Sequence, residues 1–325
     1  MAVDAKTDRV IVITGASSGV GRATAEALAR SGARLVLAAR GESALQEVAA
    51  QCRQAGAQVL VVRTDVTEVG ALEHLSRTAI ERFGRIDVWI NNAGIGAVGA
   101  FETTPMAAHE QVVATDLVGY MRGAHAVLPH FKARGRGTLI NILSLGAWAP
   151  TPYAAAYSAA KFGLRGFTDA LRGELGAWRD IHVCDVHPSF VDTPGMQHAG
   201  NYVGRALKPP PGVVGVEAVA RAIIDLIERP RRQVVVGRGV TAMARAARFL
   251  APGATVATMA RLLEAYFAVG GRARPGPGNL FTPSRDRGAS GGWRRSGARL
   301  AATAAAGVAV LLAGAWLARS RKRTA

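Results

Sequence analysis

Seven short runs of β-branched and aliphatic residues, separated by longer segments, constrain the fold of this chain most. The runs are nearly continuous in apolar residues rather than alternating, which is typical of parallel strands covered on both faces. The segments between them are long enough for crossover helices. This pattern predicts an α/β fold with a doubly wound, mostly parallel sheet and helices on both of its faces. The runs are Arg9–Thr14, Arg34–Ala39, Gln58–Val62, Ile86–Asn91, Thr138–Leu143, Ile181–Val186 and Gln233–Val236.

A glycine-rich loop follows the first run, where residues 14–21 read Thr-Gly-Ala-Ser-Ser-Gly-Val-Gly. Gly15 permits a tight turn, Gly19 lets a pyrophosphate approach the backbone, and Gly21 allows close packing of helix on strand. The helix that follows offers free N–H groups and the positive end of its dipole to phosphates. A purely structural glycine turn is the alternative. The place of the glycine loop between the first strand and the first helix favours a Rossmann-type dinucleotide site.

The second motif is a tyrosine and a lysine four residues apart, Tyr157 and Lys161. At this spacing both side chains project from one face of a helix. A phenol has an unperturbed pKa of roughly 10, and a nearby cation favours the phenolate and brings the pKa toward neutrality. Ser144 precedes Tyr157 by 13 residues. Together with the glycine loop, these residues resemble the short-chain dehydrogenase/reductase family over residues 9–237.

The resemblance implies an NAD(P)-dependent oxidoreductase that acts on CH–OH groups and interconverts a ketone or aldehyde and an alcohol. Tyr157 would exchange a proton with the substrate oxygen, and Ser144 would hydrogen-bond that oxygen. Lys161 would tune Tyr157 and hold the nicotinamide ribose. Asp116 stands where the family usually has the asparagine of a water-mediated proton relay. We expect an intact relay with an altered pH profile, with loss of activity as the alternative.

Arg40 directs the choice of cofactor. An acid after the second run would bind the ribose 2′-hydroxyl of NAD, whereas an arginine there suits the 2′-phosphate of NADP. NADP(H) is therefore the predicted cofactor and NAD(H) the alternative, unless Arg40 is simply a solvated side chain. By resemblance, the other cofactor contacts are Gly15, Ser17, Ser18, Gly19, Gly21, Asp65, Val66, Asn92, Ala93, Gly94, Tyr157, Lys161, Val191 and Thr193. No His/Cys cluster has metal spacing, so we predict no metal.

A second interpretation, from a different class, is a cofactor-binding scaffold or redox sensor without turnover. Asp116 is its only support, and the presence of Ser144, Tyr157 and Lys161 argues against it. The resemblance also implies a homodimer or homotetramer.

The sequence pattern changes after the catalytic domain, which we expect to span residues 1–240. Residues 241–269 are apolar with one amphipathic face, and either pack on the domain or a subunit interface or form a membrane-surface or lid helix. Residues 270–297 are rich in Gly, Pro, Arg and Ser, which predicts a flexible linker. Residues 298–319 form a predicted transmembrane helix, and residues 320–325 a basic tail.

The predicted transmembrane helix contains 19 residues without a charge, Leu300–Ala318. At 1.5 Å per residue they would span roughly 28 Å, about one hydrocarbon core. Alanine makes the segment only weakly hydrophobic, so a surface-lying or soluble helix is the alternative. Because NADP(H) is cytosolic, we expect the catalytic domain in the cytoplasm. Anchoring hints at a lipophilic substrate.

The net charge of +17 does not indicate nucleic-acid binding. Residues 270–325 carry eleven of the 40 basic side chains and one of the 23 acidic ones, so much of the excess lies in the tail. The rest of the chain has no basic stripe with interleaved aromatic residues, which excludes nucleic acid as the expected partner.

Overall fold

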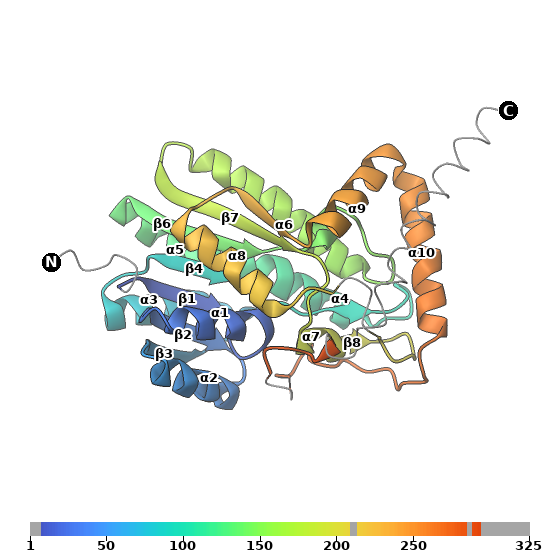
Figure 1. The fold of residues 1–325 in the computed structure, drawn as a ribbon, viewed down its shortest axis with the longest axis horizontal. Coiled ribbons are helices and arrows are strands. Elements are labelled where there is room, and N and C mark those ends of the chain that lie inside the picture. The colour runs from blue at the N-terminus through green and yellow to red at the C-terminus, as the bar shows by residue number, and fades with distance from the viewer. Residues whose placement is uncertain (1–7, 209–212, 285–287, 294–325) are drawn as a thin grey trace.

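Seven parallel strands form one sheet in the order β3-β2-β1-β4-β6-β7-β9, as the computed structural model shows for residues 8–208, 213–284 and 288–293 (Figure 1). The order reverses between β1 and β4, so the chain winds in both directions from the centre, and the predicted doubly wound parallel sheet is confirmed. The strands are β1 (Val10–Thr14), β2 (Arg34–Ala39), β3 (Gln58–Arg63), β4 (Val88–Asn91), β6 (Arg136–Ile142), β7 (Asp180–Pro188) and β9 (Gln233–Val236).

Helices cover both faces of the sheet, and each face has its own apolar core. One face packs against α1 (Gly19–Ala29), α2 (Glu42–Gln54) and α8 (Val216–Glu228). The other packs against α3 (Ala71–Phe83), α5 (Gly119–Arg134) and α6 (Ala155–Glu174). Figure 1 shows α1 and α8 in front of the strands. Because both faces are covered, β1 is buried along its whole length, which explains its unbroken apolar run.

A second, small sheet pairs β5 (Ala97–Val98) with β8 (Gly200–Asn201) in parallel, and the sequence analysis did not predict it. Strands of two residues are too short to show any periodicity. The pair nevertheless joins the loop after β4 to the segment after α7 (Pro194–Gln197), which lies about 100 residues later in the chain.

The apolar segment of residues 241–269, called the extension below, lies in two helices, α9 (Arg238–Leu250) and α10 (Pro252–Ala268). The break falls at Pro252, which lacks the N–H that a continuous helix needs but suits the first turn of a new one. The α10 helix contacts the catalytic domain, because Tyr153 packs edge-on against Phe267 and donates to the Glu264 carboxylate at 2.7 Å. These contacts favour the interpretation in which the extension packs on the main domain.

The described part of residues 270–297 differs from the expected flexible linker. Leu280 is fully buried, and Gly276 forms a two-way backbone pair with Asn201. Glycine and proline are typical of irregular backbone, and here a buried leucine and carbonyls that accept hydrogen bonds hold such backbone against the domain. Residues 298–319 and 320–325 lie outside the described residues. Among the helices that the structure describes, none is both long and apolar enough to cross a membrane.

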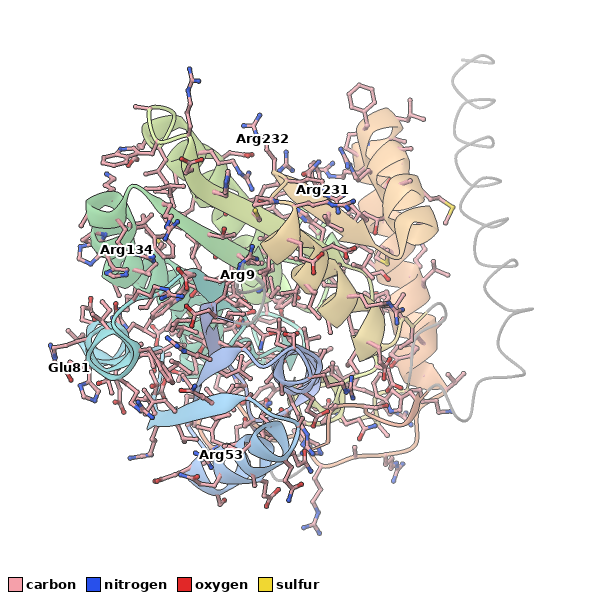
Figure 2. All side chains as sticks on the ribbon, turned by 60° about the vertical axis from the view of Figure 1, so that its left-hand side comes forward. Arg9, Arg53, Glu81, Arg134, Arg231 and Arg232 are labelled. Carbon is pink, nitrogen blue, oxygen red and sulfur yellow. The ribbon has the colours of Figure 1, made fainter. Side chains whose placement is uncertain are left out.

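Arginines close the amino-terminal end of the sheet, on the side that comes forward in Figure 2. Arg9 donates to the Ile227 carbonyl at 2.6 Å, and Arg134 donates to the Ile86 carbonyl at 2.7 Å. Arg134 also forms an ion pair with Asp87 at 3.0 Å. Arg9 and Arg134 are therefore held in place by backbone carbonyls and by Asp87. The predicted site residues lie at the opposite, carboxyl ends of the strands.

Candidate active site

The predicted catalytic side chains converge at the carboxyl ends of the strands, beside the point where the strand order reverses. Ser144 follows β6, and Tyr157 and Lys161 project from the first turns of α6. Asp116 lies in a π-helical turn, Ala114–Val118, between α4 (Met106–Val113) and α5. In open parallel sheets this crevice is where ligands bind.

A buried ion pair lies at the centre of the site. Lys161 Nζ is 3.1 Å from Asp116 Oδ2, and the two side chains are 4% and 1% exposed. Lys161 also donates to the Ile142 carbonyl at 3.3 Å, while Asp116 Oδ1 accepts the Ile95 N–H at 2.9 Å. Burial opposes the charged form of Lys161, but Asp116, with smaller contributions from Tyr120 and Tyr157, holds the pKa of the lysine above its ordinary value. The pair thus anchors α6 to the loop after β4.

The environment of Tyr157 differs from the sequence expectation. Lys161 Nζ lies 5.6 Å from the phenol ring centre, and the Ser144 hydroxyl also favours the phenolate. Burial nevertheless dominates and raises the pKa of Tyr157 above its ordinary value, with the Asp116 charge acting in the same direction. The structure therefore indicates a raised pKa for Tyr157 and not the expected lowered one. The spacing of Tyr157 and Lys161 in the sequence shows neither the burial of the phenol nor the Asp116 carboxylate that balances the lysine charge.

Residues 91–94 (Asn-Asn-Ala-Gly) pack against the glycine loop and hydrogen-bond to its first residues. A Cβ on Gly21 would lie 2.3 Å from the Gly15 carbonyl oxygen, so only glycine allows this approach of helix and strand. The Asn92 amide donates to the Thr14 carbonyl at 2.9 Å, and Thr14 Oγ1 accepts the Asn92 N–H at 3.0 Å. Ala93 lies directly against Gly15. This packing places the start of α1 directly after the turn that ends β1, which is where a helix N-terminus can bind a phosphate.

The remaining predicted cofactor residues fall into two groups. Ser17, Ser18 and Gly19 belong to the glycine loop, where Ser18 precedes α1 in extended conformation and a Cβ on Gly19 would contact the Thr193 methyl at 3.4 Å. Around them lie the ends of other elements. Asp65 accepts the Thr67 N–H and hydroxyl, Val66 packs against Gly119, Gly94 lies beside the Asp116 carboxylate, and Val191 pairs with Val214.

Arg40 does not lie free at the end of β2. Its guanidinium donates to the backbone carbonyls of Asn279 (2.7 Å), Leu280 (2.9 Å) and Thr282 (3.2 Å). These contacts join residues about 240 positions apart in the sequence, and composition offered no signal for them.

Tyr120 was not singled out from the sequence, although it touches the site. Its hydroxyl donates to the Ile142 carbonyl at 3.0 Å, and its ring centre is 4.8 Å from Lys161 Nζ. Its position four residues after Asp116, on the same helical face, is the only signal that could have indicated it. His187, in contrast, accepts the Trp148 indole N–H at 3.0 Å, and burial lowers its pKa to about 4, as suits a structural residue.

Comparison with known proteins points in one direction. The family model described as short chain dehydrogenase matches residues 9–202. The uncharacterized oxidoreductase YxnA of Bacillus subtilis is 36% identical over 245 residues, which cover 73% of this chain and 67% of that protein.

Solved structures with the same fold are complexes with NAD or an NADP derivative. A short chain dehydrogenase/reductase from Burkholderia phymatum in complex with NAD superposes with a TM-score of 0.67 and 28% identity, over 74% of this chain and 93% of that one. An alcohol dehydrogenase from the archaeon Thermococcus sibiricus, complexed with 5-hydroxy-NADP, has a TM-score of 0.62 and 29% identity over 70% and 95% of the two chains.

Proposed function

The chain belongs to the short-chain dehydrogenase family and is a nicotinamide-dependent oxidoreductase, and from this premise we propose that it interconverts a ketone or aldehyde and an alcohol with NADP(H) as preferred cofactor. The observation that carries the proposal is the convergence of Ser144, Tyr157 and Lys161, with its buried partner Asp116, at the reversal point of the sheet. When bound, the nicotinamide supplies or accepts the hydride.

Tyr157 is proposed to exchange the proton with the substrate oxygen, because its phenol is the acidic group beside Ser144. Ser144 holds that oxygen by a hydrogen bond. Lys161 is fixed in its charged form by Asp116, so it stabilises the phenolate when Tyr157 gives up its proton. Lys161 also has donors for the ribose hydroxyls.

The residues of the nucleotide loop fit a dinucleotide. The close approach of Gly21 to the Gly15 carbonyl, which any Cβ would prevent, supports a role in seating a pyrophosphate at the start of α1. Arg40 is the proposed ligand of the 2′-phosphate. Val191 and Thr193 are proposed to contact the nicotinamide carboxamide, since Thr193 lies against Gly19 of the glycine loop.

Membrane attachment through residues 298–319, a lipophilic substrate and a homodimer or homotetramer are proposed on the sequence and the family alone. The uncharged segment Leu300–Ala318 supports the first of these, and the second follows from it.

A screen of ketones and aldehydes with NADPH and NADH in parallel tests the proposal. We expect turnover, with a lower KM for NADPH. Arg40→Ala should change the ratio of the two KM values against NADPH by about tenfold, since a charge-assisted contact contributes roughly 1.5–3 kcal/mol. Arg30→Ala, an exposed arginine after α1, is the control and should leave the ratio unchanged. Binding of NADPH without turnover on any substrate would instead favour the scaffold or sensor.

Asp116→Asn should move the pH profile of alcohol oxidation to lower pH. The Asp116 charge raises the pKa of Tyr157, and oxidation needs the phenolate as base, so removing the charge makes the base available at lower pH. The measurement is kcat/KM against pH for both proteins. Asp169→Asn, the same charge change at an exposed site on α6, should leave the profile in place. Coincident profiles for Asp116→Asn and wild type would mean that the two groups are not coupled.

A further inference from the structure

Residues 276–293 contact both the glycine loop and Arg40 at the end of β2. We call this segment the strap, and the structure describes it over residues 276–284 and 288–293. It follows α10 and turns back toward α7 and β8, in orange and red in Figure 1. Its first part is held by the backbone: Gly276 pairs with Asn201, and the Asn279 N–H donates to the His198 carbonyl at 2.8 Å.

Leu280 is the apolar anchor of the strap. Its side chain is fully buried in a cluster with Ile95, Ala97 and Val112, and Tyr157 packs at the edge of the same cluster. Burying a Leu side chain is favourable because it removes apolar surface from water. The strap is therefore held by an apolar contact next to the proposed proton donor, not only by hydrogen bonds.

The strap occupies the hydrogen-bond donors of Arg40, the residue that we propose binds the 2′-phosphate at the adenosine end of the cofactor. Three of its carbonyls, those of Asn279, Leu280 and Thr282, surround the Arg40 guanidinium at 2.7–3.2 Å. Pro283 then lies against Gly41, where a Cβ would contact it at 3.2 Å. Carbonyl oxygens carry the partial negative charge of an acceptor, so they take the place around Arg40 that a phosphate would take.

Further along, the strap reaches the phosphate loop and the proposed nicotinamide end. The Gly19 N–H, at the start of α1, donates to the Gly288 carbonyl at 3.1 Å. Asp192 accepts the Ser290 hydroxyl and the Trp293 N–H, each at 3.0 Å. Gly291 lies against the backbone of Thr193. The strap thus contacts residues that we assign to three parts of the dinucleotide.

We propose that the strap is an internal competitor for the cofactor groove, and that NADP(H) binds only when the strap leaves it. The inference rests on the proposed cofactor. The Gly19 N–H has one hydrogen and cannot donate to Gly288 and to a pyrophosphate at once. The 2′-phosphate displaces the carbonyls from Arg40 because an anion attracts the guanidinium charge more strongly than a neutral carbonyl oxygen does, and can accept two parallel hydrogen bonds from it.

Under this competition the apparent dissociation constant of the cofactor equals the intrinsic constant divided by the fraction of molecules whose groove is open. Because the strap must leave for either cofactor, releasing it should tighten NADPH and NADH binding by the same factor. The ratio of their KM values then still reports on Arg40 and the 2′-phosphate, independently of the strap.

A pair of glycine variants in the full chain tests the competition. Gly278 has φ +54°, and a Cβ there would lie 2.2 Å from the His198 carbonyl oxygen, so Gly278→Ala should dislodge the strap. Gly276→Ala is the matched control on the same segment, because a Cβ at Gly276 meets nothing within 4 Å. In fluorescence titrations with NADPH, Gly278→Ala should have a dissociation constant about tenfold lower than wild type, as expected if roughly nine grooves in ten are covered. Gly276→Ala should match wild type.

A chain ending at Pro275, compared with one ending at Trp293, repeats the test without a substitution. The shorter chain should bind NADPH as tightly as Gly278→Ala, and the longer one as wild type. Equal or weaker binding by Gly278→Ala and by the chain ending at Pro275, with native circular dichroism, would overturn the competition. If even the chain ending at Pro275 fails to bind NADPH, the proposed cofactor is wrong, and the competition fails with it.

Hydrogen exchange distinguishes a competitor from a lid. If NADPH displaces the strap, the amides of Gly276 and Asn279 lose their acceptors, the Asn201 and His198 carbonyls, and should exchange faster in the bound state. Slower exchange of residues 276–284 with NADPH would mean that the strap closes over the cofactor, and would overturn the proposal.

Discussion

Tyr157→Phe is expected to lower kcat/KM for carbonyl reduction by about a thousandfold, within the range of roughly 10²–10⁴ that general acid–base groups contribute. The substitution removes only the hydroxyl that exchanges the proton and keeps the ring packed at the edge of the cluster around Ile95 and Leu280. The dissociation constant for NADPH and the melting temperature should therefore change little. Steady-state kinetics, a fluorescence titration and thermal unfolding measure the three quantities.

Tyr153→Phe is the matched control for this loss. Tyr153 lies four residues earlier, and its hydroxyl donates to Glu264 on α10 rather than toward Ser144. It should retain activity within about a factor of two or three, because its lost hydrogen bond contributes only about 1 kcal/mol to stability. If Tyr157→Phe keeps more than a tenth of the wild-type activity, another group must donate the proton.

Lys161→Met is expected to lower the free energy of unfolding by about 3–5 kcal/mol, besides abolishing turnover. It leaves the Asp116 carboxylate, 1% exposed, without its ion-pair partner, and breaking a buried pair on one side is strongly destabilising. Burial raises the pKa of Asp116 above its ordinary value while Lys161 lowers it, so this pKa rises further when the lysine is removed. The loss should therefore be larger at pH 8 than at pH 5, where the carboxyl can take up a proton. Urea unfolding at the two pH values measures it.

The double variant Lys161→Met, Asp116→Leu separates stability from catalysis. Replacing both charges by apolar groups of similar size should restore most of the free energy of unfolding, while turnover stays lost. Lys132→Met, an exposed lysine near the end of α5, should change stability by no more than about 0.5 kcal/mol. A fully stable Lys161→Met protein would show that Asp116 carries no charge in the native state.

The strand and loop patterns predicted the sheet well, because they depend on near neighbours in the chain. An apolar run such as residues 10–14 is uninterrupted whenever both faces of a strand are covered, whatever covers them. The glycine spacing in residues 15–21 predicts a tight turn at the start of a helix, and close backbone contacts there bear this out. Boundaries moved by a few residues, and the two-residue strands β5 and β8 had no pattern to detect.

The charge environment of the site could not be predicted from the sequence. Asp116 was noticed as a departure from the family, but its contact with Lys161 joins residues 45 positions apart through a π-helical turn. Whether the lysine lowers the pKa of Tyr157 depends on how deeply the phenol is buried and on what balances the lysine charge. Both quantities follow from packing, not from spacing.

The sequence alone therefore determined the fold class, the family and the identity of the side chains that meet at the carboxyl ends of the strands, because local periodicity and motif spacing encode them. Only the tertiary structure decided what those side chains face. Tyr157 is partly buried beside the Lys161–Asp116 ion pair, and Arg40 and Gly19 are covered by the strap. The composition of residues 270–297 indicated irregular backbone, but a burial such as that of Leu280 depends on a cavity built by residues far away in the chain.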